Sequence, residues 1–585
     1  MSPNRPDPGR VRHRRQVWLS LVIVVIAAVV GGCVSIPTSS SPQPIGSLER
    51  RNPSANVPSP TPGMDPESLV RAFLKAGVNP GSGHLAARQF LTTKASDDWD
   101  DRGGSLILGQ INVLTDDRTA DAFSVRLIGD NTGTLQSNGQ LIPASGRVEI
   151  KLGLVRQNGE WRIDGPLPAG AILDRTVFEN SYQSHSLYFP STDGRRLVAD
   201  PRWLYAANRQ LPDQLIGLLI QGPSDDIARA VNNPFNAGSN LRGSITTDGG
   251  GVRMDLTGLV DTDDQVRTLL AAQIVWTLAR NEIPGPYRID ADGVALLDKY
   301  PGGLQTTDVA ALDPTAVPAE TVGLNVIRGG ALLKVEQAGE SPAPGPTGTS
   351  NSIIAAALSP DGSTVAIVQR AGSGQSLSLA RYGGTPQEVL RGSSITRPSF
   401  AGDANAVWSV VDGKVVRISI DPTSGATQRV ESDSGSVGSA ASGQITEFQV
   451  SRDGARVAMI VGGQVVLGVI STDRNRYSLG GVRTAAYNIG GPAVSLDWAS
   501  GDTVVVARAT TDTPVVQVQI NGTPAVGLLS SNLTPPVSAV VANSSTIYVA
   551  DSRGVLRLSS NNGEPDQYWN EVGPTMGSNS IPVLP

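Results

Sequence analysis

The sequence has few residues that could form disulfides or bind metals. Its 585 residues include one cysteine, at position 33, and three histidines, at positions 13, 84 and 185. A single cysteine excludes a disulfide within the chain, so each folded part must be stabilised by its buried core. So few thiols and imidazoles leave little material for a zinc site, and we expect neither a metal ion nor a cofactor. We expect His185 to form a local hydrogen bond rather than to act as a ligand or base.

Aromatic residues and a strong net charge are also lacking. Phe, Trp and Tyr make up 4% of the chain, whereas 65 glycines and 41 prolines are typical of short strands joined by turns. The 47 Lys and Arg residues against 53 Asp and Glu residues give a net charge of −6, which argues against nucleic-acid binding. The sequence contains no G-x-S-x-G motif, no P-loop and no G-x-G-x-x-G between a strand and a helix. We therefore predict no catalytic residues and a protein that is not an enzyme.

The first apolar stretch of the chain has the features of an export signal. Five arginines between positions 5 and 15 precede the nearly uncharged residues 17–30. This run is short for a transmembrane helix, which needs roughly 20 apolar residues. It ends at Val30, Gly31, Gly32 and Cys33, which resemble a bacterial lipobox. The resemblance implies that residues 1–32 are cleaved as a signal peptide and that Cys33 carries diacylglycerol on its thiol, with an amino group that can then be acylated. The alternative is an uncleaved signal anchor with Cys33 as an unmodified thiol.

Residues 33–63 are rich in serine and proline, so we expect them to form a flexible tether. Residues 64–180 then predict an α+β domain. Asp65 is placed to cap a helix whose apolar residues recur at helical spacing, and strand-like segments follow up to a hairpin turn at Asn158 and Gly159. This order of helices and strands resembles the small helix-on-sheet domains of the nuclear-transport-factor type.

Residues 185–300 predict a second domain. A helix through 214–219 ends at Gly222, and residues 263–279 have the spacing of an amphipathic helix. The ordered segments Y-F-P, L-L-I-Q-G-P, V-R-M-D-L, A-A-Q-I-V-W-T-L and Y-R-I-D-A-D-G resemble the GerMN module, which is named for spore germination and sporulation proteins. The resemblance implies an extracytoplasmic α/β domain without catalytic activity.

Residues 320–585 contain degenerate repeats. Leu-Ser-Pro-Asp-Gly at 358–362 recurs as Val-Ser-Arg-Asp-Gly at 450–454, and weaker copies are spaced by roughly 40 to 50 residues, the length of a four-stranded propeller blade. We assign Asp361 and Asp453 to turns between strands rather than to a calcium or catalytic site. The fold class we predict is therefore multidomain, with two α+β or α/β domains followed by an all-β propeller of about six blades. A stack of separate sandwiches is the alternative for this region.

The order of these five parts resembles the actinobacterial LpqB lipoproteins over nearly the whole chain. The resemblance implies a lipid-anchored protein on the outer face of the cytoplasmic membrane. It also implies binding to the extracellular domain of a two-component sensor histidine kinase of the MtrB type, and modulation of its signalling in cell-envelope homeostasis and division. An envelope enzyme or a peptidoglycan-binding protein that uses the propeller remains the alternative, and contact with the cell wall is left open.

Overall fold

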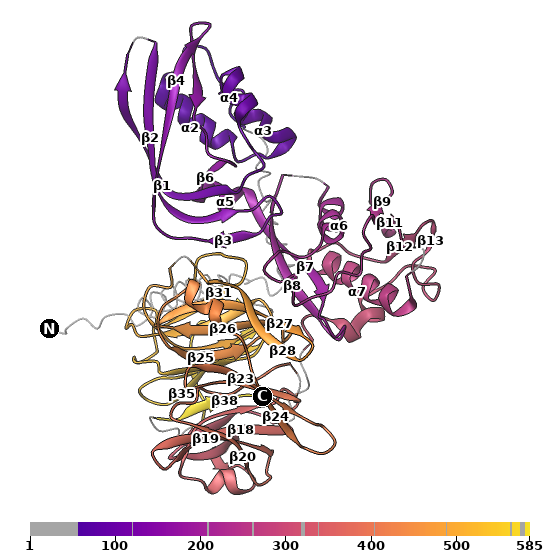
Figure 1. Cartoon of the computed structure of the whole chain (residues 1–585), viewed down its shortest axis with the longest axis vertical. Helices are drawn as coiled ribbons and strands as arrows, with labels where there is room; N and C mark the ends of the chain where they lie inside the picture. Colours follow the sequence, from indigo (N-terminus) through magenta and orange to yellow (C-terminus); the bar gives the residue numbers. More distant parts are fainter. Residues whose placement is uncertain are drawn as a thin grey trace, which may run out of the picture. The chain divides into compact units, whose positions relative to one another are not determined.

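The computed structural model describes residues 57–585, except positions 120, 208–209, 260–261, 317–321, 337–338, 403, 487, 562–563 and 574–578. The predicted signal peptide, the lipobox and most of the tether (residues 33–63) lie outside the described residues. Two mixed helix-and-strand domains are followed by an all-β region, which confirms the predicted fold class (Figure 1). None of the helices within the described residues is long and apolar enough to cross a membrane.

The first domain is a sheet with helices on one side. Asp65 caps its first helix as predicted, because the carboxylate accepts the backbone N–H of Ser68 at 3.0 Å. The sheet has the order β5-β4-β2-β1-β6, with β3 paired to β2, and α2 to α4 lie against one side of it (Figure 1). The elements are α2 (Pro66–Ala76), α3 (Gly81–Arg88), α4 (Thr93–Asp98), β1 (Ser105–Arg118), β2 (Ala122–Leu135), β3 (Leu141–Pro143), β4 (Arg147–Gln157), β5 (Glu160–Gly165), β6 (Ile172–Asp174) and α5 (Arg175–Ser181).

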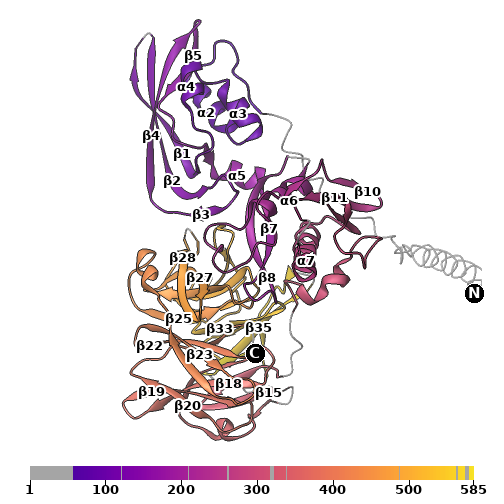
Figure 2. The ribbon, with the colours of Figure 1, turned by 45° about the vertical axis from the view of Figure 1, so that its right-hand side comes forward.

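The second domain packs a hairpin, two helices and a small sheet around one core. The hairpin is β7–β8, and the sheet has the order β10-β11-β12-β13, with β9 paired to β11. Figure 2 shows α7 beside β7, where Tyr188 donates its N–H to the Thr277 hydroxyl at 3.1 Å. The elements are β7 (Tyr182–Pro190), β8 (Leu197–Tyr205), α6 (Leu211–Gln221), β9 (Asn240–Leu241), β10 (Thr246–Asp248), β11 (Gly251–Thr257), α7 (Asp264–Arg280), β12 (Tyr287–Ala291), β13 (Val294–Ala295) and the 3-10 helix η2 (Thr306–Leu312).

The predicted amphipathic character of α7 is wrong. Every residue from 270 to 278 is buried, including Gln273 and Thr277. The helix is enclosed by the β7–β8 hairpin, α6 and η2, so it has no long solvent-facing side. The same core includes Val309 of η2 and therefore extends beyond residue 300.

Within the described residues, the all-β region consists of six sheets arranged as a ring. The first strands of successive sheets contact one another in the closed order β38, β17, β21, β25, β29, β33 and back to β38. The strands are β14 (Asn325–Arg328), β15 (Ala331–Glu336), β16 (Gly339–Pro342), β17 (Ile353–Leu358), β18 (Thr364–Ala371), β19 (Gly374–Arg381), β20 (Gln387–Gly392), β21 (Ser399–Phe400), β22 (Ala406–Val411), β23 (Lys414–Ile420), β24 (Thr427–Glu431), β25 (Ile445–Val450), β26 (Arg456–Val461), β27 (Gln464–Asp473), β28 (Arg476–Thr484), β29 (Ala493–Trp498), β30 (Thr503–Arg508), β31 (Val515–Gln519), β32 (Val526–Gly527), β33 (Ala539–Ala542), β34 (Thr546–Ala550), β35 (Val555–Asn561), β36 (Glu564–Pro565), β37 (Asn570–Glu571) and β38 (Ile581–Val583), with the 3-10 helices η3 (Pro346–Thr349) and η4 (Gly435–Ser439) between them.

One blade is assembled from segments far apart in the sequence. Strand β38 pairs antiparallel with β14, with Val583 opposite Asn325 and Ile581 opposite Ile327. Val583 and Ile327 are buried in the same apolar cluster as Ile353 of the next blade. Residues 581–583 therefore close the ring that β14 begins.

The Asp-Gly repeats form the turns between the first two strands of their blades, as predicted. Asp361 accepts the N–H of Ser363 at 3.0 Å, and Gly362 has φ +68°. Asp453 accepts the N–H of Ala455 at 3.0 Å in the equivalent turn. Each loop is longer than the two-residue hairpin that Asp-Gly suggests. The aspartate side chain accepts a backbone N–H within the loop and so stabilises this longer turn.

Candidate functional site

Cys33, which is predicted to carry the lipid, and the lipobox residues Val30, Gly31 and Gly32 lie outside the described residues, so their roles remain predictions. His185 forms a hydrogen bond, with 2.9 Å between its Nδ1 and Asn281 Oδ1, but the partner lies 96 positions along the chain and is not local as expected. His84 lies buried against Trp99, with 5.5 Å between ring centroids, and burial lowers the pKa of this histidine. Among the residues that the structure describes, no group of three or more His, Cys, Asp or Glu side chains could hold a metal ion.

The first strands of the blades surround a small cavity of about 70 Å³ with two unlike sides. One side is polar and comes from three successive blades. It is formed by Arg397, Ser399, Gln449 and Asp497. The opposite side is apolar and comes from β17, β33 and β38. It is formed by Ala356, Ala357, Val541 and Val583. The cavity has room for little more than a few water molecules, since one water takes up about 30 Å³ of the liquid.

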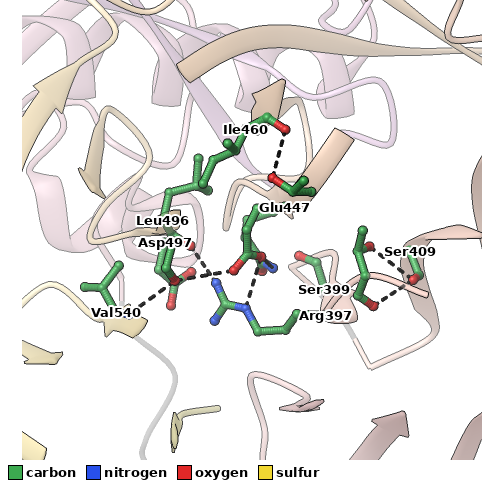
Figure 3. Close-up of polar contacts among 12 residues, drawn as sticks. Arg397, Ser399, Ser409, Glu447, Ile460, Leu496, Asp497 and Val540 are labelled. Carbon is green, nitrogen blue, oxygen red and sulfur yellow. Dashed lines mark hydrogen bonds and ion pairs between the residues drawn. The ribbon is translucent and has the colours of Figure 1, made fainter. Parts of the chain in front are cut away.

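Arg397 connects the three polar blades (Figure 3). Its Nε donates to the carboxylate of Glu447 at 3.4 Å, and its Nη2 donates to the carbonyl oxygen of Leu496 at 2.5 Å. Glu447 also accepts the hydroxyl of Ser495 at 3.3 Å and the side-chain amide of Gln449 at 3.4 Å. The hydrogen bonds of Arg397 and Ser495 therefore join neighbouring blades. The bond from Gln449 to Glu447 lies within one blade.

The electrostatics of the cavity follow from burial. Burial raises the pKa of Glu447, and the neighbouring Arg397 opposes that rise. Burial by itself would lower the pKa of Arg397, but Glu447 and Asp497 raise it on balance. Asp497 accepts the N–H of Ala542 in the following blade at 3.1 Å. The Glu447 carboxylate already accepts from a guanidinium, a hydroxyl and an amide. It is therefore poorly placed to act as a general base, which must lie within hydrogen-bonding distance of a substrate proton.

Sequence analysis missed these cavity residues, although a signal exists. Three of the polar residues occupy the same position in their blades, one before the last residue of the first strand. They are Ser399, Gln449 and Asp497. The equivalent positions in two other blades hold Ala357 and Val541. An alignment of the blade repeats within the sequence would have shown polar residues at a strand position that is apolar in other blades.

We expect Arg397→Met to destabilise the propeller by about 2–4 kcal/mol at neutral pH, because Glu447 then remains buried without its cation. The loss should shrink as the pH is lowered, since protonation relieves a buried carboxyl group whose folded-state pKa is raised. Calorimetric melting at pH 7.5 and pH 5 measures both effects. Glu447→Gln in the same chain should restore most of the stability, and a double variant as unstable as Arg397→Met would contradict the charge explanation.

A second cavity of about 260 Å³ lies beside the first, and both are lined by Pro360, Gly402 and Arg452. One wall consists of the propeller loops that follow the first strands of the blades. The other wall consists of Tyr188 in β7, residues 195–197 and Ala199 around the start of β8, and residues 311–316 at the end of η2 and after it. We call this cavity the seam pocket, because it lies where the second domain meets the propeller.

The contacts around the seam pocket are made by arginines that donate to backbone carbonyls. Arg196 donates Nη1 to the carbonyl of Arg452 at 2.8 Å and Nη2 to the carbonyl of Gly402. From the propeller, Arg456 donates Nη2 to the carbonyl of Ala199 at 2.7 Å. Ala455 of the propeller also belongs to the second domain's apolar core. The second domain and the propeller are therefore joined by both polar and apolar contacts.

Gly402→Ala should loosen this seam by about 1–3 kcal/mol, the usual range for forcing extra volume into a packed site. A Cβ at this position would overlap the Arg196 guanidinium and the Arg452 carbonyl oxygen. Faster amide hydrogen exchange in residues 191–199 and in the loop around 402 is the expected observation. Gly438→Ala is the matched control, because a Cβ at Gly438 would meet no heavy atom within 4 Å. Equal exchange in the two variants would show that the Arg196 contacts do not stabilise the seam.

The comparisons with known proteins cover each folded part of the chain. The family described as "Lipoprotein LpqB, N-terminal domain" matches residues 59–179, and "Sporulation and spore germination" matches residues 186–297. The family described as "Lipoprotein LpqB beta-propeller domain" matches residues 330–585. The ring of six sheets described above is therefore a propeller domain of this type.

Curated relatives match along almost the full length. A lipoprotein LpqB of Rhodococcus jostii is 42% identical over 581 residues, which are 96% of this chain and 97% of the relative. The lipoprotein LpqB of Mycolicibacterium smegmatis is 40% identical over 97% of this chain and 99% of its own. That of Mycobacterium tuberculosis is 40% identical over 96% of this chain and 98% of its own. At this identity and coverage, the chain belongs to the LpqB family of lipoproteins.

Proposed function

We propose that the protein is a lipid-anchored accessory protein on the outer face of the cytoplasmic membrane, which binds the extracellular domain of a two-component sensor histidine kinase of the MtrB type. Binding would modulate signalling in cell-envelope homeostasis and division. The observation that carries the proposal is full-length membership of a lipoprotein family, together with a lipobox that ends at the chain's only cysteine. The lipid would hold the protein near the kinase and so raise its effective concentration.

The polar groups of the propeller support an adaptor over an enzyme. Glu447 and Asp497 bind neighbouring blades, and the seam pocket mixes Arg452 with Asp453 and Asp502 rather than grouping acids with a base. Its lining, as far as the structure describes it, includes no histidine. Such a surface suits recognition better than general acid–base catalysis, which needs a group of matched pKa within reach of a substrate.

Modulation of the kinase requires more than contact. A bound protein shifts an equilibrium between two kinase conformations only if it binds one of them more tightly. We therefore propose that the folded part of the protein has different affinities for the signalling and resting forms of the sensor domain.

Cys33→Ala tests the anchor. We expect the variant to be released from the membrane or to accumulate with residues 1–32 still attached, and kinase-dependent transcription to fall toward the level of a deletion strain. Membrane fractionation and mass spectrometry of the mature amino terminus measure the first effect. Unchanged signalling from a soluble form at equal abundance would show that tethering is not part of the mechanism.

Photo-crosslinking in the full-length chain would test kinase binding and locate its interface. Removing whole domains would confuse the result, because the second domain and the propeller share core residues. One exposed apolar residue in each domain offers a site for the crosslinker: Leu114 (44% exposed), Val294 (64%) and Tyr568 (61%). Capture of a sensor kinase from one site supports the proposal, whereas capture of glycan fragments alone from the Tyr568 site would favour a wall-binding protein.

A further inference from the structure

We propose that the seam pocket binds a short zwitterionic peptide with small apolar side chains, and that the bound peptide stabilises the junction between the second domain and the propeller. The inference does not depend on kinase binding. It follows from the charges on the pocket walls, from its apolar lining and from the fact that both domains build it.

Both walls of the pocket carry charges of both signs. The propeller wall has Arg452 beside Asp453 and Asp502. The other wall has Arg195, Arg196 and Asp313, and Asp313 is paired with Arg280 at 2.9 Å. Asp453 accepts from the hydroxyl of Ser451 and the N–H of Ala455, and Asp502 accepts from the hydroxyls of Ser500 and Thr503. These described partners are uncharged, so they leave both carboxylate charges uncompensated. An ammonium group of a ligand would supply the missing positive charge.

The arginines of the pocket lie on both walls, and their described partners are also uncharged. The side chains of Arg196 and Arg452 donate to backbone carbonyls, including that of Ala542 at 2.9 Å from Arg452. Arg195 lines the same pocket from the hairpin and is exposed. A ligand carboxylate beside Arg195 would form a charge-assisted hydrogen bond without breaking any contact of the seam. A ligand with only one sign of charge would leave either the two aspartates or Arg195 without a charged partner.

The remaining lining and the volume limit the body of the ligand. The pocket is also lined by apolar residues, namely Leu197, Leu312, Pro314, Pro360 and Ala499. The volume of about 260 Å³ lies just below the range of roughly 300–1,000 Å³ that is usual for small-molecule sites. It suits two or three residues with methyl-sized side chains, and a long acyl chain would not fit.

Tyr188 of β7 lines the end of the pocket that lies near Asp502 of the propeller. Burial raises the pKa of its hydroxyl to about 12, and the nearby carboxylate of Asp502 adds to the rise. Tyr188 lies in β7 and Asp502 lies between β29 and β30, so a ligand at this end would touch both domains. Because such a ligand binds only the closed seam, it stabilises that arrangement by mass action.

Titration of the full-length chain in detergent micelles with L-alanyl-L-alanyl-L-alanine would test the inference. We expect saturable binding by calorimetry and slower amide exchange in residues 191–196. Arg195→Gln and Asp502→Asn should each weaken binding about tenfold, the usual effect of losing one charge-assisted contact. Ala311→Trp should abolish binding, because Ala311 lines the pocket and is exposed, so the larger side chain fills the pocket without replacing a core residue.

Two controls make the result decisive. Arg370→Gln removes an exposed arginine elsewhere on the propeller and should leave binding unchanged. N-acetylated trialanine amide keeps the apolar body without the terminal charges and should bind at least tenfold more weakly. Equal affinity for the capped and free peptides would overturn the zwitterionic recognition. Absence of binding up to about 10 mM free peptide, weaker than any specific site of this kind should be, would overturn the site itself.

Discussion

Deletion of Ser580–Pro585 should open the propeller and lower its stability by about 5 kcal/mol or more. The deletion removes β38, which supplies the first strand of the blade begun by β14. It exposes apolar side chains around Ile327 and Ile353, and each such side chain contributes about 1.5–3 kcal/mol when buried. It also leaves β14 with an unpaired edge, which favours aggregation. Calorimetric melting and size-exclusion chromatography measure these effects.

A shorter deletion is the matched control. Removing only Leu584 and Pro585 keeps the pairing of Val583 with Asn325 and should change the melting temperature by a few degrees at most. In the full-length chain, Val583→Asp should reproduce most of the damage, because it buries an unpaired charge at a position that is 2% exposed. If the longer deletion melted like the parent protein, ring closure by β38 would not be a main source of propeller stability.

Arg202→Met should cost about 3–5 kcal/mol, the usual effect of removing one partner from a buried ion pair. Arg202 Nη2 lies 2.6 Å from Asp200 Oδ2, and their side chains are only 1% and 2% exposed. Asp200 also accepts the N–H of Ser224 at 2.8 Å, so its charge is held by one cation and by neutral donors. Arg202 further donates to the carbonyl of Asn138 at 2.8 Å, and the substitution therefore also weakens the contact with the first domain.

A second substitution distinguishes the effect of the unpaired buried charge from the effect of lost packing. Asp200→Asn in the Arg202→Met background removes the buried carboxylate charge that has lost its cation. It keeps an acceptor for the Ser224 N–H, so much of the lost stability should return. Arg175→Met at the exposed pair with Glu179 should change stability by less than about 1 kcal/mol. Calorimetric melting and the exchange rate of the Ser224 amide report the effects. If the double variant were no more stable than Arg202→Met, the buried charge would not be the cause.

Features that depend on neighbouring residues could be predicted from the sequence. Asp65 caps α2 because its side chain reaches an N–H only three residues away. Asp361 and Gly362 form a turn for a similarly local reason. The period of the repeats predicted a ring of blades, since each blade has apolar faces that only its neighbours can cover. The amphipathic character of α7 failed as a prediction, because elements distant in sequence enclose the helix.

The contacts that build the cavities were decided by the tertiary structure. Arg397 meets Glu447 across 50 positions of sequence, and Arg196 meets Arg452 across 256. Arg196 donates to the backbone carbonyl oxygen of Arg452, and Arg456 likewise donates to that of Ala199. Every residue has a backbone carbonyl, so the acceptor's side chain carries no information about the contact. The sequence by itself therefore determined the order of the domains and the turns of the propeller, whereas only the folded chain determined which carbonyls each arginine reaches and where the seam pocket lies.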